Sequence, residues 1–132
     1  MTAPTPRRIL IVDDDSDIRD TLKEVLEDEG YVVAGAGDGL EALELLRNAE
    51  ELPGLILLDV MMPRMNGIQF CVERRKHSSW SQIPLIVMSA TNKSDLRSER
   101  ELKCRLYLRK PLNLRELLAV LTGCFDGRAA GA

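Results

Sequence analysis

The sequence predicts an α/β fold built on a doubly wound, five-stranded parallel sheet with strand order 2-1-3-4-5. Two observations lead to this prediction. Short apolar runs alternate five times with segments whose apolar residues recur at helical spacing, which is typical of βα repeats. Three of the runs are apolar at nearly every position, as central strands covered by helices on both faces must be.

The strands are expected at five segments. Those at 8–12, 54–58 and 84–88 are the almost wholly apolar runs and should be central. The segment 31–35 runs into glycines, and 105–108 alternates polar with apolar residues, so both should form edges. In this order the chain reverses direction between the first and third strands. Ligands of such sheets bind beyond the carboxyl ends of the strands at that point.

Helices should connect these strands. The clearest helical spacing belongs to Ile18, Leu22, Val25 and Leu26, and to Leu114, Leu117, Leu118 and Leu121. Helix-capping residues are expected at Asp15, Asp38, Asn66 and Asn113. The segment 93–104 has few large apolar residues, so a helix there would bury little surface. Either a mobile element or an ordinary surface helix fits that segment.

Size and composition exclude several classes of protein. The chain has 132 residues, which suits one domain, and its net charge of -3 without a basic stripe disfavours direct nucleic-acid binding. No apolar run is long enough for a membrane span and residues 1–6 lack a signal core, so the expected location is the cytoplasm. Cys71, Cys104 and Cys124 have no paired short spacing, which indicates reduced thiols rather than a disulfide framework or a zinc site.

Acidic residues stand where two neighbouring central strands should end. Asp13 and Asp14 follow the first run, and Asp59 follows the third. Two such charges about 4 Å apart repel by roughly 4 kcal/mol at an effective dielectric near 20, so protons or a cation must relieve the cluster. An all-oxygen site with open water positions suits Mg²⁺. The alternative is an acidic run that favours the helix dipole, and we adopt it only for Asp15, as an N-cap.

A hydroxyl and an ammonium group are expected at the same edge. Ser89 ends the fourth run, and Lys110 precedes Pro111 after the fifth. Each has an ordinary alternative, as a turn hydroxyl or an exposed turn lysine. In the predicted strand order, however, both can reach a phosphoryl group on Asp59, where the lysine would supply charge and the serine a hydrogen bond. The sequence therefore predicts a site for a divalent cation and a phosphoryl group.

Four segments resemble the receiver domain of response regulators. They are ILIVDDD at 9–15, LLDVMMPRMNG at 57–67, IVMSA at 86–90 and YLRKP at 107–111, of which the second is the most specific. The resemblance covers about residues 7–122 and implies a flavodoxin-like receiver domain there. Residues 1–6 are expected to form a disordered N-terminal segment and 123–132 a flexible C-terminal tail, or the start of a linker.

The resemblance implies a metal site and a covalent modification. Asp59 would be the phosphoacceptor, and Mg²⁺ would be bound by Asp13, Asp14, Asp59 and the backbone carbonyl of Met61. The phosphoryl donor would be a phosphohistidine on a sensor histidine kinase or a histidine phosphotransfer protein. The carboxylate of Asp59 would act as the nucleophile.

The resemblance also implies a switch. Ser89 would contact the phosphoryl group, Lys110 would pair with it, and Tyr107 would turn inward on activation. The readout would be a protein target bound through the 93–122 face, and the same face is a candidate for a homodimer contact. The chain departs from the family at Lys103-Cys104, where receivers commonly have Gly-Ala. The surface through which it signals is therefore expected to be unusual.

Two other functions remain as alternatives. An Mg²⁺-dependent phosphohydrolase also uses an aspartyl nucleophile, but that class usually has a second acid two residues later, where this chain has Met61. A receiver-shaped scaffold that binds its partner without phosphorylation would not need the complete set of acids. We therefore expect a protein that catalyses only its own phosphorylation and dephosphorylation. It would act as a stand-alone regulator, a phosphorelay intermediate or a receiver within a longer protein.

Overall fold

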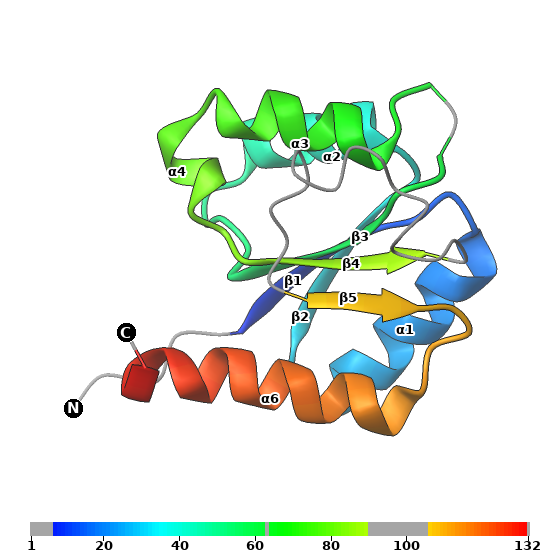
Figure 1. Cartoon of the computed structure of the whole chain (residues 1–132), viewed down its shortest axis with the longest axis vertical. Coiled ribbons are helices and arrows are strands. Elements are labelled where there is room, and N and C mark those ends of the chain that lie inside the picture. The colour runs from blue at the N-terminus through cyan, green and yellow to red at the C-terminus, as the bar shows by residue number, and fades with distance from the viewer. Residues whose placement is uncertain (1–6, 63, 90–105, 132) are drawn as a thin grey trace.

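The computed structural model describes residues 7–62, 64–89 and 106–131. They form one parallel sheet whose strands are β1 (Arg8–Val12), β2 (Val32–Ala36), β3 (Leu55–Asp59), β4 (Leu85–Ser89) and β5 (Leu106–Arg109). The strand order is β2-β1-β3-β4-β5 (Figure 1). The predicted fold class and strand order are confirmed.

The strand ends differ from the prediction in a way that matters for the site. The last four strands each end one residue later than expected, so that Asp59 and Ser89 are the final residues of β3 and β4. Both still take part in the sheet, since Asp59 is in register with Met88 and Ser89 with Arg109. Their backbones are consequently held by the sheet rather than by a loop.

Helices cover both faces of the sheet. Figure 1 shows α1 (Ser16–Asp28) and α6 (Leu114–Gly131) on one face, with α2 (Gly39–Asn48), α3 (Gly67–Arg75) and the short α4 (Ser78–Ser81) on the other. The helix considered for residues 93–104 lies outside the described residues. No apolar periodicity indicated α4, because one helical turn is too short to show a repeat.

The core consists of two apolar clusters separated by the sheet. Leu10, Ile56 and Leu58 pack on the side of α2 and α3, whereas Ile11 and Leu57 pack on the side of α1 and α6. Because neighbouring residues of a strand point to opposite faces, a central strand must be apolar throughout, and β3 and β4 are buried at every position. Each fully buried Leu or Ile contributes about 1.5–3 kcal/mol, which lets the fold carry charged groups at one edge.

The four predicted capping residues all accept hydrogen bonds from the first turn of their helices: Asp15, Asp38, Asn66 and Asn113. Asn66 forms a complete capping box with Gln69. The start of α2 is a variant of this arrangement. The carboxylate of Glu41 accepts a hydrogen bond from the amide of Gly37 rather than from the amide of the capping residue, Asp38. Local sequence therefore sets where these helices begin.

Both ends of the chain bear on the expected domain limits. Helix α6 continues to Gly131, so the expected boundary at 122 does not coincide with the end of the last helix. Residues 1–6, for which an N-terminal segment was predicted, lie outside the described residues. Within the part of the chain that is described, no helix has the length and apolar character needed to cross a bilayer.

We expect Gly67→Ala to destabilise the fold. A Cβ atom at Gly67 would lie 2.8 Å from the carbonyl oxygen of Asp59 and 2.8 Å from the Cα atom of Val60, and backbone atoms cannot move aside cheaply. Overpacking of this kind should lower the free energy of unfolding by about 2 kcal/mol. The matched control is Gly123→Ala, where nothing lies within 4 Å, and alanine should stabilise the helix by about 0.5–1 kcal/mol. Urea unfolding measures both, and effects of the same sign would contradict the expectation.

Candidate functional site

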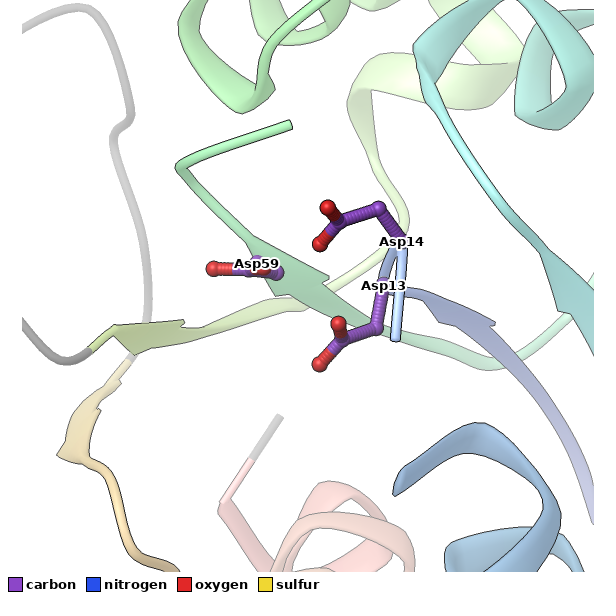
Figure 2. Close-up of side chains that lie close together, drawn as sticks. All are labelled: Asp13, Asp14 and Asp59. Carbon is purple, nitrogen blue, oxygen red and sulfur yellow. The ribbon is translucent and has the colours of Figure 1, made fainter. Parts of the chain in front are cut away.

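Three carboxylates meet at the carboxyl ends of β1 and β3. One ligand atom from each of Asp13, Asp14 and Asp59 lies within 4.8 Å of the others. Figure 2 shows Asp13 and Asp14 just after β1 and Asp59 at the end of β3, with their carboxylates gathered at one edge of the sheet. Asp13 and Asp59 are buried and Asp14 is exposed, so the cluster opens to solvent on one side. The predicted juxtaposition of the three acids is confirmed.

The backbone of Asp13 is held from two sides. Its amide donates to the carbonyl of Ala36 at the end of β2 (3.0 Å), and Arg19 of α1 donates from Nη1 to its carbonyl oxygen (2.7 Å). One oxygen of its carboxylate accepts from the amide of Asp15 at 2.9 Å. These contacts hold both the backbone and the fully buried carboxylate of Asp13.

Asp59 is a buried acid with few compensating contacts. Its Oδ1 accepts from the amide of Met61 at 3.3 Å, and its Oδ2 lies 3.4 Å from Nζ of Lys110. Burial and the charge of Asp13 raise the pKa of Asp59 to about 6, against the opposing effects of Lys110 and the Met61 amide. The ionised form of Asp59 is therefore disfavoured by its surroundings, and additional positive charge nearby would stabilise it.

Lys110 pairs with the carboxylates of both buried acids. Its Nζ donates to Oδ2 of Asp13 at 2.8 Å, a shorter contact than the one it makes with Asp59. Burial alone would lower the pKa of Lys110, but the hydrogen bond with Asp13 and the charges of both acids raise it. The amide of Lys110 donates to the carbonyl of Ser89 at 2.9 Å, which ties the segment after β5 to the end of β4.

The remaining predicted residues lie around this cluster. Ser89 is buried at the end of β4, one residue beyond the residue that is in register with Asp59. Met61 lies two residues after Asp59 and is 64% exposed. Tyr107 is partly buried and packs against the apolar cluster on the α2 and α3 side of the sheet. The structure thus brings the serine and the lysine to the acids, whereas the tyrosine lies on β5, the edge strand.

Two basic residues near the site were not identified from the sequence. Arg19 holds the carbonyl of Asp13, and Arg64 forms an ion pair with the buried Asp38. Arg19 belongs to a helix whose apolar spacing shows only which residues face the core. The sequence feature related to this contact is the pair of glycines at the end of β2. A Cβ atom at Gly35 or Gly37 would lie 3.4 or 3.5 Å from the side chain of Arg19.

The arrangement combines a pocket of carboxylate oxygens with one fixed ammonium group. Oxygen ligands with an opening toward water are what a small hard cation requires. A carboxylate that is buried but reachable from the open side can act as a nucleophile when positive charge offsets the incoming negative charge. The chemistry available here is therefore cation binding and transfer of an anionic group to Asp59.

Comparison with known proteins agrees with this chemistry. A family model described as the response regulator receiver domain matches residues 9–122. The response regulator MprA of Mycobacterium sp. strain KMS is 42% identical over 118 residues, which are 86% of this chain and 48% of that protein. MprA of Mycobacterium leprae is 42% identical over 116 residues, with coverage of 85% and 48%. The chain spans about half the length of these curated relatives.

Solved structures give the same result for the fold. The chemotaxis protein CheY4 of Vibrio cholerae superposes with a TM-score of 0.81 at 31% identity, covering 89% of this chain and 98% of that one. The phosphorylated cyanobacterial phytochrome response regulator RcpA gives a TM-score of 0.74 at 27% identity, covering 90% and 91%. The sheet order, the acidic cluster and the match over residues 9–122 agree, and the chain belongs to the receiver domain family of two-component response regulators.

Proposed function

We propose that this receiver accepts a phosphoryl group on Asp59 and thereby switches a protein-interaction surface. The donor is the phosphohistidine of a sensor histidine kinase or of a histidine phosphotransfer protein. The observation that carries the proposal is the cluster of Asp13, Asp14 and Asp59 at the carboxyl ends of the central strands, in which Asp13 and Asp59 pair with the ammonium group of Lys110. RcpA, a structural neighbour, was solved as a phosphorylated protein, which supports the same chemistry in this fold.

The donor atoms available at the site fit Mg²⁺. Asp13, Asp14 and Asp59 would bind it together with the backbone carbonyl of Met61, and the exposure of Asp14 leaves positions for water. The excess of negative charge around Asp59 is the property of the site that favours a cation. When bound, Mg²⁺ would neutralise charge on the transferring group and support in-line geometry.

The residues of the chain supply the nucleophile and the response. An oxygen of Asp59 attacks phosphorus, the P–N bond to the donor histidine breaks, and the histidine nitrogen retains the electron pair and takes up a proton. The new group carries about -1.5 to -2 charge in place of the single charge of the carboxylate, and it attracts Lys110 and the hydroxyl of Ser89. Because the amide of Lys110 donates a hydrogen bond to the carbonyl of Ser89, movement of one residue is transmitted to the other.

The output would follow from this movement. Tyr107 belongs to the 93–122 face itself and lies on β5, three residues before Lys110. Residues 93–105 of that face lie outside the described part. A shift of Tyr107 would bias that face between two states that a protein target or a second copy of the chain distinguishes. Catalysis would be limited to phosphorylation and dephosphorylation of Asp59 itself. We expect the chain to act in the cytoplasm, as a stand-alone regulator or as the receiver of a longer protein.

Phosphorylation should require Asp59. After incubation with a small-molecule phosphodonor and Mg²⁺, the intact mass of the wild type should increase by one phosphoryl group, and chelation of Mg²⁺ should slow the gain strongly. Asp59→Asn should show no gain, since it removes the nucleophile. Asp15→Asn is the matched control, because Asp15 belongs to the same acidic run but caps α1 and does not join the cluster. No gain in the wild type, or an equal gain in Asp59→Asn, would refute the proposal.

Lys110→Ala should separate modification from switching. The variant should still accept the phosphoryl group, more slowly than the wild type, because it keeps the nucleophile and the three acids. The amide chemical-shift changes that phosphorylation causes at Ser89 and Tyr107 should be lost, since the linking ammonium group is absent. Lys76→Ala, which removes an exposed lysine paired with Glu73, is the control and should switch normally. Shift changes in Lys110→Ala equal to those of the wild type would assign the switch to other residues.

The ionisation of Asp59 should destabilise the metal-free protein. Its pKa is raised from 3.8 to about 6, so the folded state holds the proton more tightly than the unfolded chain, and stability falls as pH rises through this interval. A shift of about two units corresponds to at most about 3 kcal/mol, and solvent at the open side reduces this to about 1 kcal/mol. At pH 7 Asp59→Asn should therefore be more stable than the wild type by about that amount. Below about pH 4 the variant and the wild type should have the same free energy of unfolding. Urea unfolding at both pH values tests this, and a difference independent of pH would contradict it.

A further inference from the structure

A third buried carboxylate, beside those of Asp13 and Asp59, lies near the site and belongs to neither the acidic cluster nor the apolar core. Asp38 is only 3% exposed, at the turn between β2 and α2. Its Oδ1 accepts from the amide of Glu41 at 2.9 Å and so caps α2. Its Oδ2 accepts from Nε of Arg64 at 2.6 Å and also from a terminal nitrogen of the same guanidinium group. The two oxygens of Asp38 therefore serve two different elements of the fold.

Arg64 belongs to the loop that follows the phosphoacceptor. This β3–α3 loop is described at residues 60–62 and 64–66. Its base is closed by the amide of Gly67, which donates to the carbonyl of Val60 at 2.9 Å. Its far side is fastened to the β2–α2 turn, because the amide of Gly39 donates to the carbonyl of Met65 at 3.0 Å. A Cβ atom at Gly39 would lie 2.6 Å from Cγ of Met65, so this contact is closely packed.

The backbone of Arg64 indicates that its side chain has a specific task. Its φ angle is 61°, in the left-handed region that costs a residue other than glycine roughly 1 kcal/mol. Glycine or asparagine would suit this backbone better. Arginine instead provides a guanidinium group that pairs with a buried carboxylate. Burial raises the pKa of Asp38, but hydrogen bonds from the Glu41 amide and from Arg64 outweigh burial and keep the pKa below its usual value.

This pair differs from two exposed ion pairs elsewhere in the described part of the chain. Arg8 with Glu51 and Lys76 with Glu73 join side chains that are each at least one third exposed, and such pairs contribute little. The side chain of Asp38, in contrast, is only 4% exposed. Loss of Arg64 would therefore leave a buried negative charge whose remaining hydrogen bonding is that of the α2 cap. The β3–α3 loop is thus attached to the β2–α2 turn by an ion pair and a backbone hydrogen bond, close to the residue whose carbonyl faces the cluster in the proposed function.

We propose that Asp38 and Arg64 are positioning residues that hold the β3–α3 loop so that the carbonyl of Met61 is presented to the cation. The proposal rests on the proposed function, since it concerns binding of Mg²⁺ beside Asp59. Neither residue touches the cation or the phosphoryl group. They act through the backbone of the loop, and their removal should weaken cation binding more than it slows phosphoryl transfer once the cation is bound.

The test uses Arg64→Gly, which removes the guanidinium group and at the same time suits the left-handed backbone. Titration calorimetry should show a dissociation constant for Mg²⁺ raised about fivefold, somewhat less than the 10-fold or more that loss of a ligand's own hydrogen-bond partner costs. The phosphorylation rate should fall at low Mg²⁺ and recover at saturating Mg²⁺. In the absence of Mg²⁺, the amides of Gly39 and Gly67 should exchange with solvent faster than in the wild type.

Three further variants complete the design. Asp38→Asn keeps an oxygen that can cap α2 but loses the charge, and it should weaken Mg²⁺ binding as Arg64→Gly does. The double variant should be no worse than either single one, because both remove the same contact. Arg64→Lys should restore part of the affinity. Glu51→Gln, which removes the exposed partner of Arg8, is the matched control and should bind Mg²⁺ like the wild type.

Two outcomes would overturn the proposal. If Arg64→Gly binds Mg²⁺ as the wild type does, or only lowers the unfolding temperature, then the pair merely stabilises the fold, and phosphorylation of Asp59 remains as proposed. If the wild type itself fails to bind Mg²⁺ and to gain a phosphoryl group, both proposals are wrong. A shift in Mg²⁺ affinity that is shared by the two single variants and the double variant, and absent from Glu51→Gln, would support it.

Discussion

The repulsion between buried carboxylates at one edge of the sheet is the constraint on which the rest of the structure depends. Asp13 and Asp59 are held there by β1 and β3, two adjacent central strands that cannot move apart without opening the core. Lys110 offsets part of the charge from the segment after β5. The apolar clusters on the two faces of the sheet must stabilise the fold sufficiently to carry this strain. In the proposed function, the repulsion that should weaken the metal-free protein would also favour the binding of a cation.

Most of this arrangement could be predicted because it depends on regular patterns. The runs ending at Asp59 and Ser89 are apolar throughout, and only a central parallel strand requires that, so the strand order followed. The order in turn predicts that Asp13, Asp14 and Asp59 lie together, as they do. The ends of β3 and β4 were predicted one residue too early, because a polar residue at the end of a buried strand, such as Asp59 or Ser89, looks in the sequence like the first residue of a loop.

What could not be predicted depends on contacts between residues that no pattern connects. Asp38 was identified as a helix cap from its local sequence, and that role is confirmed. Its second role depends on Arg64, 26 positions later in a loop without periodicity, whose direction is set by a backbone angle that the sequence does not reveal. Arg19 is similar, since its contact with the carbonyl of Asp13 requires the relative placement of α1 and β1. Local spacing predicts elements, but it does not predict which charged groups meet between them.

The double use of Asp38 has a consequence for how this chain can vary. Each of its oxygens is committed to a different element, one to the first turn of α2 and the other to Arg64. Serine or threonine, which can replace aspartate at helix starts, would cap α2 but would leave Arg64 without a carboxylate partner. Glutamate would place its oxygens too far from the backbone to cap α2. Position 38 should therefore accept far fewer residue types than Asp15, the cap of α1, although the two look alike in the sequence.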